Sequence, residues 1–226
     1  MLKYPCLVLD HDDTVVQSEA TVNYPFFCYI LDQYRPGLDQ YRPGTKISLA
    51  QYTEGCFHLG FADMCRQWYG FTEQELVEEY AGWQEYIQDH IPAPFPGIAQ
   101  VLRRQKQEGG LICVVSHSCV QNITRDYQTH FGLLPDAIYG WDLPEHQRKP
   151  SAYPLEQIMN TYHLPPEQLL VVDDMKPAWE MARKVQVPIA FAGWGRRDCP
   201  ELSQEMTRLC DFSFSTVQEL ENFLFD

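Results

Sequence analysis

The sequence lacks the features of several large protein classes. No apolar run approaches the roughly 20 residues that a membrane-spanning helix requires, and the first residues reach a group of acids too soon for a signal peptide. Basic residues are scarce, with 17 against 31 acidic residues and a net charge of −14. Nucleic-acid binding depends on clustered Lys and Arg that neutralise phosphates, so we expect no nucleic-acid partner, and an anionic membrane surface is equally disfavoured.

Paired cysteines are missing as well. The eight cysteines are scattered and include no C-x-x-C pair. In a chain of this size, that pattern is typical of reduced thiols in a cytoplasmic protein, many of them core residues. We therefore predict a cytoplasmic protein without a structural zinc site. The 226 residues are enough for one large domain, or for a domain with an insertion.

Short apolar runs alternate with helical patterns along most of the chain. The strand-like runs are 6–10, 111–116, 169–174 and 187–193, and the helical segments are 97–108, 119–131, 151–162 and 177–186. Runs without amphipathic alternation suit strands that are buried on both faces of a parallel sheet. The sequence therefore predicts an α/β fold with a Rossmann-like three-layer α/β/α core and a mostly parallel sheet.

One segment breaks this alternation. From about residue 16 to residue 92 the pattern is helical, and the proline-rich stretch 91–97 returns to the core. We predict a helical domain over 16–92, inserted into a core made of 1–15 and 93–226. Two apolar stripes at helical spacing are expected to be core faces of packed helices. Their members are Phe57, Phe61, Met64 and Trp68, and Leu76, Tyr80, Trp83 and Ile87.

A tandem repeat of seven residues, LDQYRPG, occupies 31–44 within this insert. Two copies are too few for a solenoid, and each copy ends in Pro-Gly, which favours a turn. We interpret the repeat as a local duplication that lengthens a loop or a helix end.

Polar residues follow three of the four predicted strands. They are Asp10, Ser116 and the pair Asp173–Asp174. Ligands of open α/β sheets bind beyond the carboxyl ends of the strands, so these residues are expected to meet at one edge. Carboxylates brought that close repel one another, and a hard cation such as Mg²⁺ would relieve the repulsion.

This set of residues suits phosphoryl transfer. A metal-bound Asp10 would stay ionised and attack phosphorus, and Asp12 would protonate the leaving oxygen and later activate water. Ser116 and Lys149 would hold the phosphoryl oxygens. The sequence thus predicts an enzyme that acts on a small phosphorylated metabolite.

The ordered set, with its strands, resembles the haloacid dehalogenase superfamily, in the branch of phosphoglycolate phosphatases and β-phosphoglucomutases. The matching residues are Asp10, Asp12 and Thr14 in D-x-D-x-T, then Ser116, Lys149, and the acidic pair Asp173 and Asp174. The resemblance implies Mg²⁺ as cofactor, bound by Asp10, Asp12, Asp173 and Asp174, with Asp12 contributing its backbone carbonyl. It also implies an aspartyl-phosphate intermediate on Asp10, a phosphate contact from the backbone amide of His117, and a mobile cap formed by the insert.

The sequence departs from the family pattern at two places. Asp13 stands where the family usually has Gly, and we expect this extra acid to turn away from the metal or to pair locally. In the fourth motif Asp173 stands where many members have Gly, and Ala178 replaces a second acid. The ring of His117 has no assigned task and is expected to be solvated at the surface.

Several activities remain open within this family. Asp12 favours phosphoryl chemistry over dehalogenation, so the prediction is a phosphatase that hydrolyses a small phosphate monoester. The alternatives are a sugar-phosphate mutase and a non-catalytic member that binds phospho-ligands. Over residues 15–92 the insert has eleven acidic residues and only four basic ones, Arg35, Arg42, Lys46 and Arg66. That balance favours a substrate without a second anionic group. The sequence does not fix the oligomeric state.

Overall fold

The computed structural model describes residues 2–38 and 46–226. These residues form two compact units, one from 1–17 and 93–226 and the other from 18–92. Part of the tandem repeat lies outside the described residues, so its interpretation stays a prediction. In the described part of the chain, no helix is both long and apolar enough to cross a membrane.

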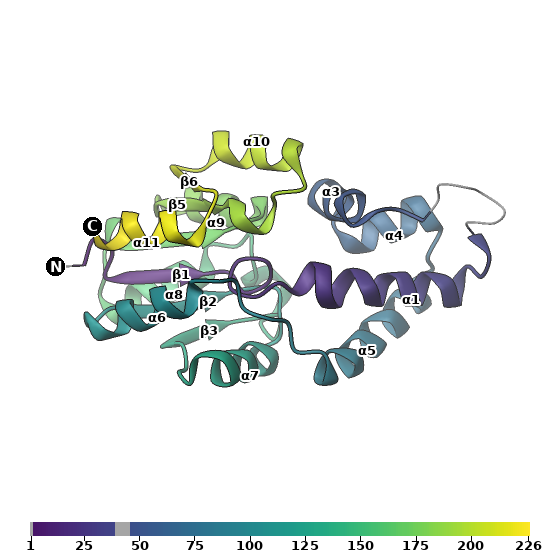
Figure 1. Cartoon of the computed structure of the whole chain (residues 1–226), viewed down its shortest axis with the longest axis horizontal. Helices are drawn as coiled ribbons and strands as arrows, with labels where there is room; N and C mark the ends of the chain where they lie inside the picture. Colours follow the sequence, from purple (N-terminus) through teal and green to yellow (C-terminus); the bar gives the residue numbers. More distant parts are fainter. Residues whose placement is uncertain (1, 39–45) are drawn as a thin grey trace. The chain divides into compact units, whose positions relative to one another are not determined.

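A six-stranded sheet forms the centre of the first unit, in the order β3-β2-β1-β4-β5-β6 (Figure 1). Its strands are Cys6–Leu9 (β1), Leu111–Val115 (β2), Ala137–Tyr139 (β3), Leu169–Asp173 (β4), Ile189–Ala192 (β5) and Phe212–Phe214 (β6). Every neighbouring pair is parallel. The structure confirms the predicted α/β fold and the four predicted strands. The other two, β3 and β6, are three residues long and escaped prediction.

Helices cover both faces of this sheet, as predicted for a three-layer core. They are Ile98–Gln107 (α6), Val120–Phe131 (α7), Tyr153–Tyr162 (α8), Lys176–Lys184 (α9), Pro200–Leu209 (α10) and Val217–Phe225 (α11), with 3₁₀ turns at Glu145–Gln147 (η2), Pro166–Gln168 (η3) and Gly193–Gly195 (η4). Alternate residues of β1 point to opposite faces: Leu7 and Leu9 join the core under α6, α7 and α11, whereas Cys6 and Val8 join the core under α8 and α9. Because both faces are covered, the strands read as continuous apolar runs.

The second unit is helical. It consists of a π-helical turn, Glu19–Asn23 (η1), followed by Tyr24–Tyr34 (α1), Leu49–Leu59 (α3), Phe61–Tyr69 (α4) and Glu73–Asp89 (α5). Capping boxes at Ser48 and Thr72 start α3 and α5, because each hydroxyl accepts a hydrogen bond from the third residue of its helix. An aromatic cluster around Phe27 and Tyr52 forms the core of this unit.

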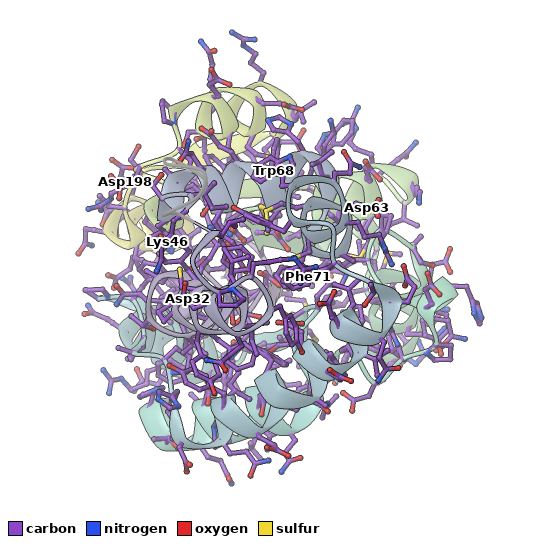
Figure 2. The ribbon with its side chains drawn as sticks, turned by 90° about the vertical axis from the view of Figure 1, so that its right-hand side faces the viewer. Asp32, Lys46, Asp63, Trp68, Phe71 and Asp198 are labelled. Atoms are coloured by element: carbon purple, nitrogen blue, oxygen red, sulfur yellow. The ribbon has the colours of Figure 1, made fainter. Side chains whose placement is uncertain are left out.

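One of the predicted stripes is wrong at Trp68, whose side chain is 45% exposed (Figure 2). Gly60, at φ +78°, separates α3 from α4, so the spacing from Phe57 onward crosses a break between two helices. The buried positions of α4 are Met64, Cys65 and Tyr69 instead. The Trp68 ring of α4 still contacts α3 at Gly55. The contact is so close that a Cβ added to Gly55 would lie 2.6 Å from the ring.

Candidate active site

The sheet register brings three predicted site segments to one edge. Leu9 of β1 pairs with Val114 of β2 and with Val172 of β4, so the residues that follow each of them leave the sheet side by side. The Asp10 amide continues this register, since it donates to the Val172 carbonyl at 3.0 Å. Asp10, Ser116 and the Asp173–Asp174 pair therefore meet at the carboxyl edge, as the sequence predicts.

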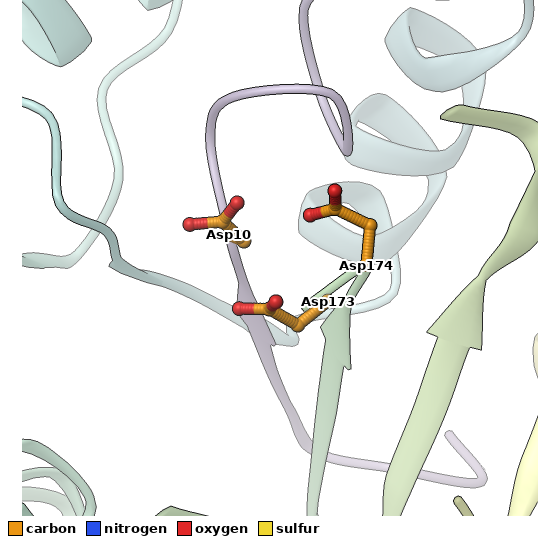
Figure 3. Close-up of side chains that lie close together, drawn as sticks. All are labelled: Asp10, Asp173 and Asp174. Carbon is orange, nitrogen blue, oxygen red and sulfur yellow. The ribbon is translucent and has the colours of Figure 1, made fainter. Parts of the chain in front are cut away.

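Asp10, Asp173 and Asp174 form a buried group of carboxylates (Figure 3). One oxygen from each lies within 4.8 Å of the others. Carboxylate oxygens in this arrangement fit a hard divalent cation such as Mg²⁺, and softer metals would call for His or Cys ligands. Among the described residues, Asp12 adds no side-chain oxygen to this group. A role for its backbone carbonyl as a ligand stays a prediction.

Lys149 lies between two of these acids. Its ammonium nitrogen is 2.7 Å from Asp10 Oδ1 and 2.7 Å from Asp173 Oδ2. The Asp173 carboxylate also accepts a hydrogen bond from the Met175 amide at 2.8 Å, at the start of α9. Lys149 comes from the loop before α8, and the fold brings it to the ends of β1 and β4, while its role as a phosphate ligand stays a prediction.

Burial and charge set the pKa values of these groups in opposite directions. Burial pushes the pKa of Asp10 upward, but the Lys149 ammonium and hydrogen bonds from Lys149, the His11 amide and the Ser116 hydroxyl outweigh it, and the net pKa is lowered. Burial raises the pKa of Asp173 well above its ordinary value, and the charges of Asp10 and Asp174 add to the rise. Burial opposes the charge of Lys149, yet its two carboxylate partners raise its pKa. Of these two acids, Asp10 is therefore the one better able to stay ionised.

Ser116 and His117 belong to the loop after β2. The Ser116 hydroxyl accepts a hydrogen bond from the Ser118 amide at 3.1 Å and donates to Asp10. His117 is exposed, as expected, but its ring also makes contacts: Nε2 donates to the Lys149 carbonyl at 3.0 Å, and the ring meets Trp141 edge-on. Desolvation by the surrounding loops, followed by the charge of Lys149, lowers the pKa of His117 although the residue keeps exposed surface. A neutral ring thus ties the Ser116 loop to the Lys149 loop.

The chain turns sharply after Asp10. Amides of Val15 and Val16 both donate to the His11 carbonyl, and the Asp13 amide donates to the Val16 carbonyl at 2.7 Å. Asp13 adopts φ +54°, a left-handed conformation that suits glycine best and that Asp tolerates. This backbone geometry explains why the related motif usually has Gly at this position.

Arg196 is the main site residue that sequence reasoning missed. It lies just after η4, is buried, and contacts two acids: Asp174 Oδ2 is 2.6 Å from its Nε, and Asp13 Oδ2 is 3.3 Å from its Nη1. Asp13 was expected to turn away from the metal or to pair locally. Among the described residues, it is not in the group of carboxylates that could hold a metal, in line with the first expectation, and it pairs with Arg196, a residue remote in sequence. A buried acid such as Asp13 needs a positively charged partner. The two consecutive arginines after β5, Arg196 and Arg197, are the feature of the sequence that could have indicated one.

His11 is a second missed residue. Its side chain is almost fully buried, and Nε2 lies 3.0 Å from Asp126 Oδ2 on α7. Arg125 contacts the other Asp126 oxygen at 2.7 Å. This chain of contacts anchors the turn after Asp10 to α7. The sequence feature that could have indicated this role is the polar character of His11 itself. An apolar residue between Asp10 and Asp12 would have continued the strand.

Comparisons with known proteins agree with this geometry. The sequence matches the family of haloacid dehalogenase-like hydrolases over residues 7–192. No functionally curated protein is similar enough in sequence to count as a relative.

Several solved structures share the fold of the whole chain. A predicted phosphoglycolate phosphatase from Haemophilus somnus is 16% identical with a TM-score of 0.73, and the match covers 99% of both chains. CbbY from Rhodobacter sphaeroides, solved in complex with phosphate, is 17% identical with a TM-score of 0.67, covering 97% of this chain and 96% of that one. A haloacid dehalogenase-like family protein from Streptococcus pneumoniae is 17% identical with a TM-score of 0.68, covering 96% and 97%.

Proposed function

The chain belongs to the haloacid dehalogenase-like hydrolases, and on that premise we propose that it is a Mg²⁺-dependent phosphatase that hydrolyses a small phosphate monoester through an aspartyl-phosphate on Asp10. The observation that carries this proposal is the position of Asp10. It is buried among two further carboxylates, and a lysine and a serine contact it directly.

In the first step, a carboxylate oxygen of Asp10 attacks phosphorus and the bond from phosphorus to the leaving oxygen breaks. Asp12 gives its proton to that oxygen, so the product leaves as a neutral alcohol. Asp12 is partly buried in the turn directly after Asp10. Its spacing of two residues from the nucleophile supports this role, and it is not a member of the carboxylate group found among the described residues.

In the second step, Asp12 takes a proton from a water molecule as that water attacks phosphorus. The acyl phosphate bond to Asp10 breaks, inorganic phosphate leaves, and both carboxylates return to their starting state. Lys149, the Ser116 hydroxyl and the His117 amide neutralise and position the phosphoryl oxygens in both steps.

A bound Mg²⁺ supplies positive charge that screens the nucleophile from the substrate oxygens. Asp10, Asp173 and Asp174 would hold it, since their carboxylates form a donor set of oxygens. Burial is the main cause of the raised pKa of Asp173, and a cation held there would offset the repulsion from Asp10 and Asp174 that adds to it.

The basic residues of the insert support a substrate without a second negatively charged group. The insert's described basic residues, Lys and Arg, are paired with acids of the same unit. Arg35 lies 2.7 Å from Glu75, and Arg66 lies 2.7 Å from both Glu73 and Asp63. Lys46 lies 3.1 Å from Asp32, and both are labelled in Figure 2. Arg42 lies outside the described residues. Cations engaged in this way are poor partners for a second phosphate or a carboxylate. We therefore propose a monoester whose alcohol part carries no negative charge, with residues 18–92 acting as the cap over it.

Phosphate release from an aryl phosphate tests this function. The wild-type protein is expected to require Mg²⁺, and Asp10→Asn is expected to lose activity by at least about 10³-fold because an amide does not attack phosphorus. Asp198→Asn is the matched control, since it makes the same change at an exposed position. Equal activity in wild type and Asp10→Asn would refute the mechanism.

The same measurement of phosphate release, made with sugar phosphates as substrates, distinguishes the mutase alternative. A mutase would keep its phosphoryl group from water and convert one sugar phosphate into another without releasing phosphate. Phosphate accumulating in proportion to consumed substrate supports the phosphatase. Isomerised sugar phosphate with little free phosphate would favour the mutase.

A further inference from the structure

Arg196 has no task in the proposed reaction, yet it is one of the most constrained side chains in the first unit. Only about 6% of its side chain is exposed. Its guanidinium bridges Asp13, in the turn after β1, and Asp174, at the end of β4. A buried arginine is costly to desolvate, and its two carboxylate partners offset that cost.

The charges at the site require such a residue. Asp13 adds a buried carboxylate beside a group of acids that already repel one another. Lys149 is engaged by Asp10 and Asp173. Arg196 is therefore the cation that compensates Asp13, and it compensates Asp174 at the same time.

The contacts also define how Asp174 is oriented. Arg196 binds Oδ2, while Oδ1 accepts a longer hydrogen bond, 3.3 Å, from the Thr14 hydroxyl. The guanidinium directs two donors, Nε and Nη2, at the same oxygen, a rigid fork that a lysine ammonium does not offer. Asp174 is thus held by two neighbours on different segments, and its oxygens keep defined directions.

The segment before Arg196 reinforces this arrangement. The Trp194 indole N–H donates to the Thr14 carbonyl at 3.0 Å. A Cβ added to Gly195 would lie 2.0 Å from the Asp13 carbonyl oxygen, so the two backbones are in direct contact. Three consecutive residues, from Trp194 to Arg196, therefore contact the turn that follows Asp10 and restrict its movement.

We propose that Arg196 is a positioning residue for the metal site: it holds Asp174 in the orientation that binds a divalent cation, and Asp13 is its counter-ion and not a metal ligand. The inference rests on the proposed function only in that both use the same cation site. It assigns a role to the acid that the sequence left unexplained. It also names the arginine that accompanies this acid.

Direct binding of Mn²⁺, followed by electron paramagnetic resonance without substrate, tests the proposal on the full chain. Arg196→Lys keeps the charge but loses the planar contact, so we expect its dissociation constant for Mn²⁺ to rise about tenfold or more, the usual effect of changing a residue that orients a ligand. Arg197→Lys is the matched control, because the neighbouring arginine is exposed and donates to the Ser215 carbonyl. It is expected to bind Mn²⁺ like the wild type.

Asp13→Asn provides a second measurement, and it still applies if Arg196→Lys does not fold. Asparagine keeps an oxygen that accepts from Arg196 and tolerates the left-handed backbone. Its dissociation constant is expected to rise less than that of Asp174→Asn, which removes a proposed ligand charge. Equal losses in these two variants would identify Asp13 as a ligand and overturn the proposal.

The outcomes separate the inference from the function. If wild type binds Mn²⁺ and a folded Arg196→Lys binds it equally well, the positioning role is refuted and the phosphatase is untouched. If the wild type binds Mn²⁺ and releases no phosphate from any ester, the function fails while a weakened Arg196→Lys still supports the positioning role. A wild type that binds no divalent cation would refute both.

Discussion

The ammonium of Lys149 and the carboxylate of Asp10 form a buried ion pair at 2.7 Å, with 5% and 7% of the two side chains exposed. The same ammonium reaches Asp173 at 2.7 Å. Lys149 therefore contributes to stability in addition to the phosphate-binding role proposed for it. Removing it leaves two buried carboxylates that repel each other.

Lys149→Met is expected to destabilise the protein by about 3 kcal/mol, the usual result of removing one partner of a buried pair. For a chain of this length, that corresponds to a Tm lower by roughly 6–12 °C in thermal unfolding. Lys176→Met is the control, because its ion pair with Glu205 is exposed and worth under about 1 kcal/mol. Mg²⁺ should raise the Tm of Lys149→Met, since the cation replaces the missing charge. Equal Tm values for the two variants would contradict this account.

Much of the fold and of the candidate site could be predicted because the polar site residues stand at the ends of strands that have a clear sequence pattern. β1, β2 and β4 are buried on both faces, so they read as apolar runs, and the polar residues that end them mark the site edge. The strands β3 and β6 are too short for such a signal.

The missed site contacts have a different cause. The partners are remote in sequence, as Asp13 and Arg196 are, and no local pattern links two residues that only the folded sheet brings together. The expectation for Trp68 failed because Gly60 interrupts the helical periodicity on which it depended.

Asp12→Asn separates the two proposed chemical steps. An aryl leaving group needs little protonation, whereas the attacking water still needs a base, so the variant should accumulate phosphorylated Asp10. Stopped-flow measurement is expected to show a burst of about one aryl alcohol per protein, followed by turnover roughly 10²–10⁴-fold slower than the wild type. With an alkyl phosphate the burst should disappear, because the first step then also needs the missing acid. Rapid steady turnover without a burst would argue against a role for Asp12 in either step.

Glu79 makes the stability of the helical unit depend on pH. Burial raises its pKa to about 7 from a model-compound value of 4.5. Between these values the folded state holds a proton that the unfolded chain releases, so stability falls as pH rises through this window and stays low above it. The loss amounts to about 3 kcal/mol.

Glu79→Gln should remove this loss. It is expected to raise the Tm at pH 8 by several degrees and to change it little at pH 5, where Glu79 is protonated in the folded protein. Glu78→Gln, at the exposed neighbouring position, serves as the control and should behave alike at both pH values. An equal effect of Glu79→Gln at pH 5 and pH 8 would contradict the buried carboxyl as the source.

Gly195→Ala tests the contact between η4 and the turn after β1. The new Cβ would lie 2.0 Å from the Asp13 carbonyl oxygen, a backbone atom that cannot rotate away. The turn must shift, so we expect a loss of about 1–3 kcal/mol in thermal unfolding, together with a higher Mn²⁺ dissociation constant, because the same movement pulls Arg196 from Asp174. Gly109→Ala is the control: its φ of +81° makes it cost about 1 kcal/mol, but a Cβ there meets no atom within 4 Å. Gly109→Ala should therefore lose some stability and bind Mn²⁺ like the wild type. If the two alanine variants bind Mn²⁺ equally, the turn tolerates the displacement, and the contact at Gly195 has no part in holding the carboxylates in place.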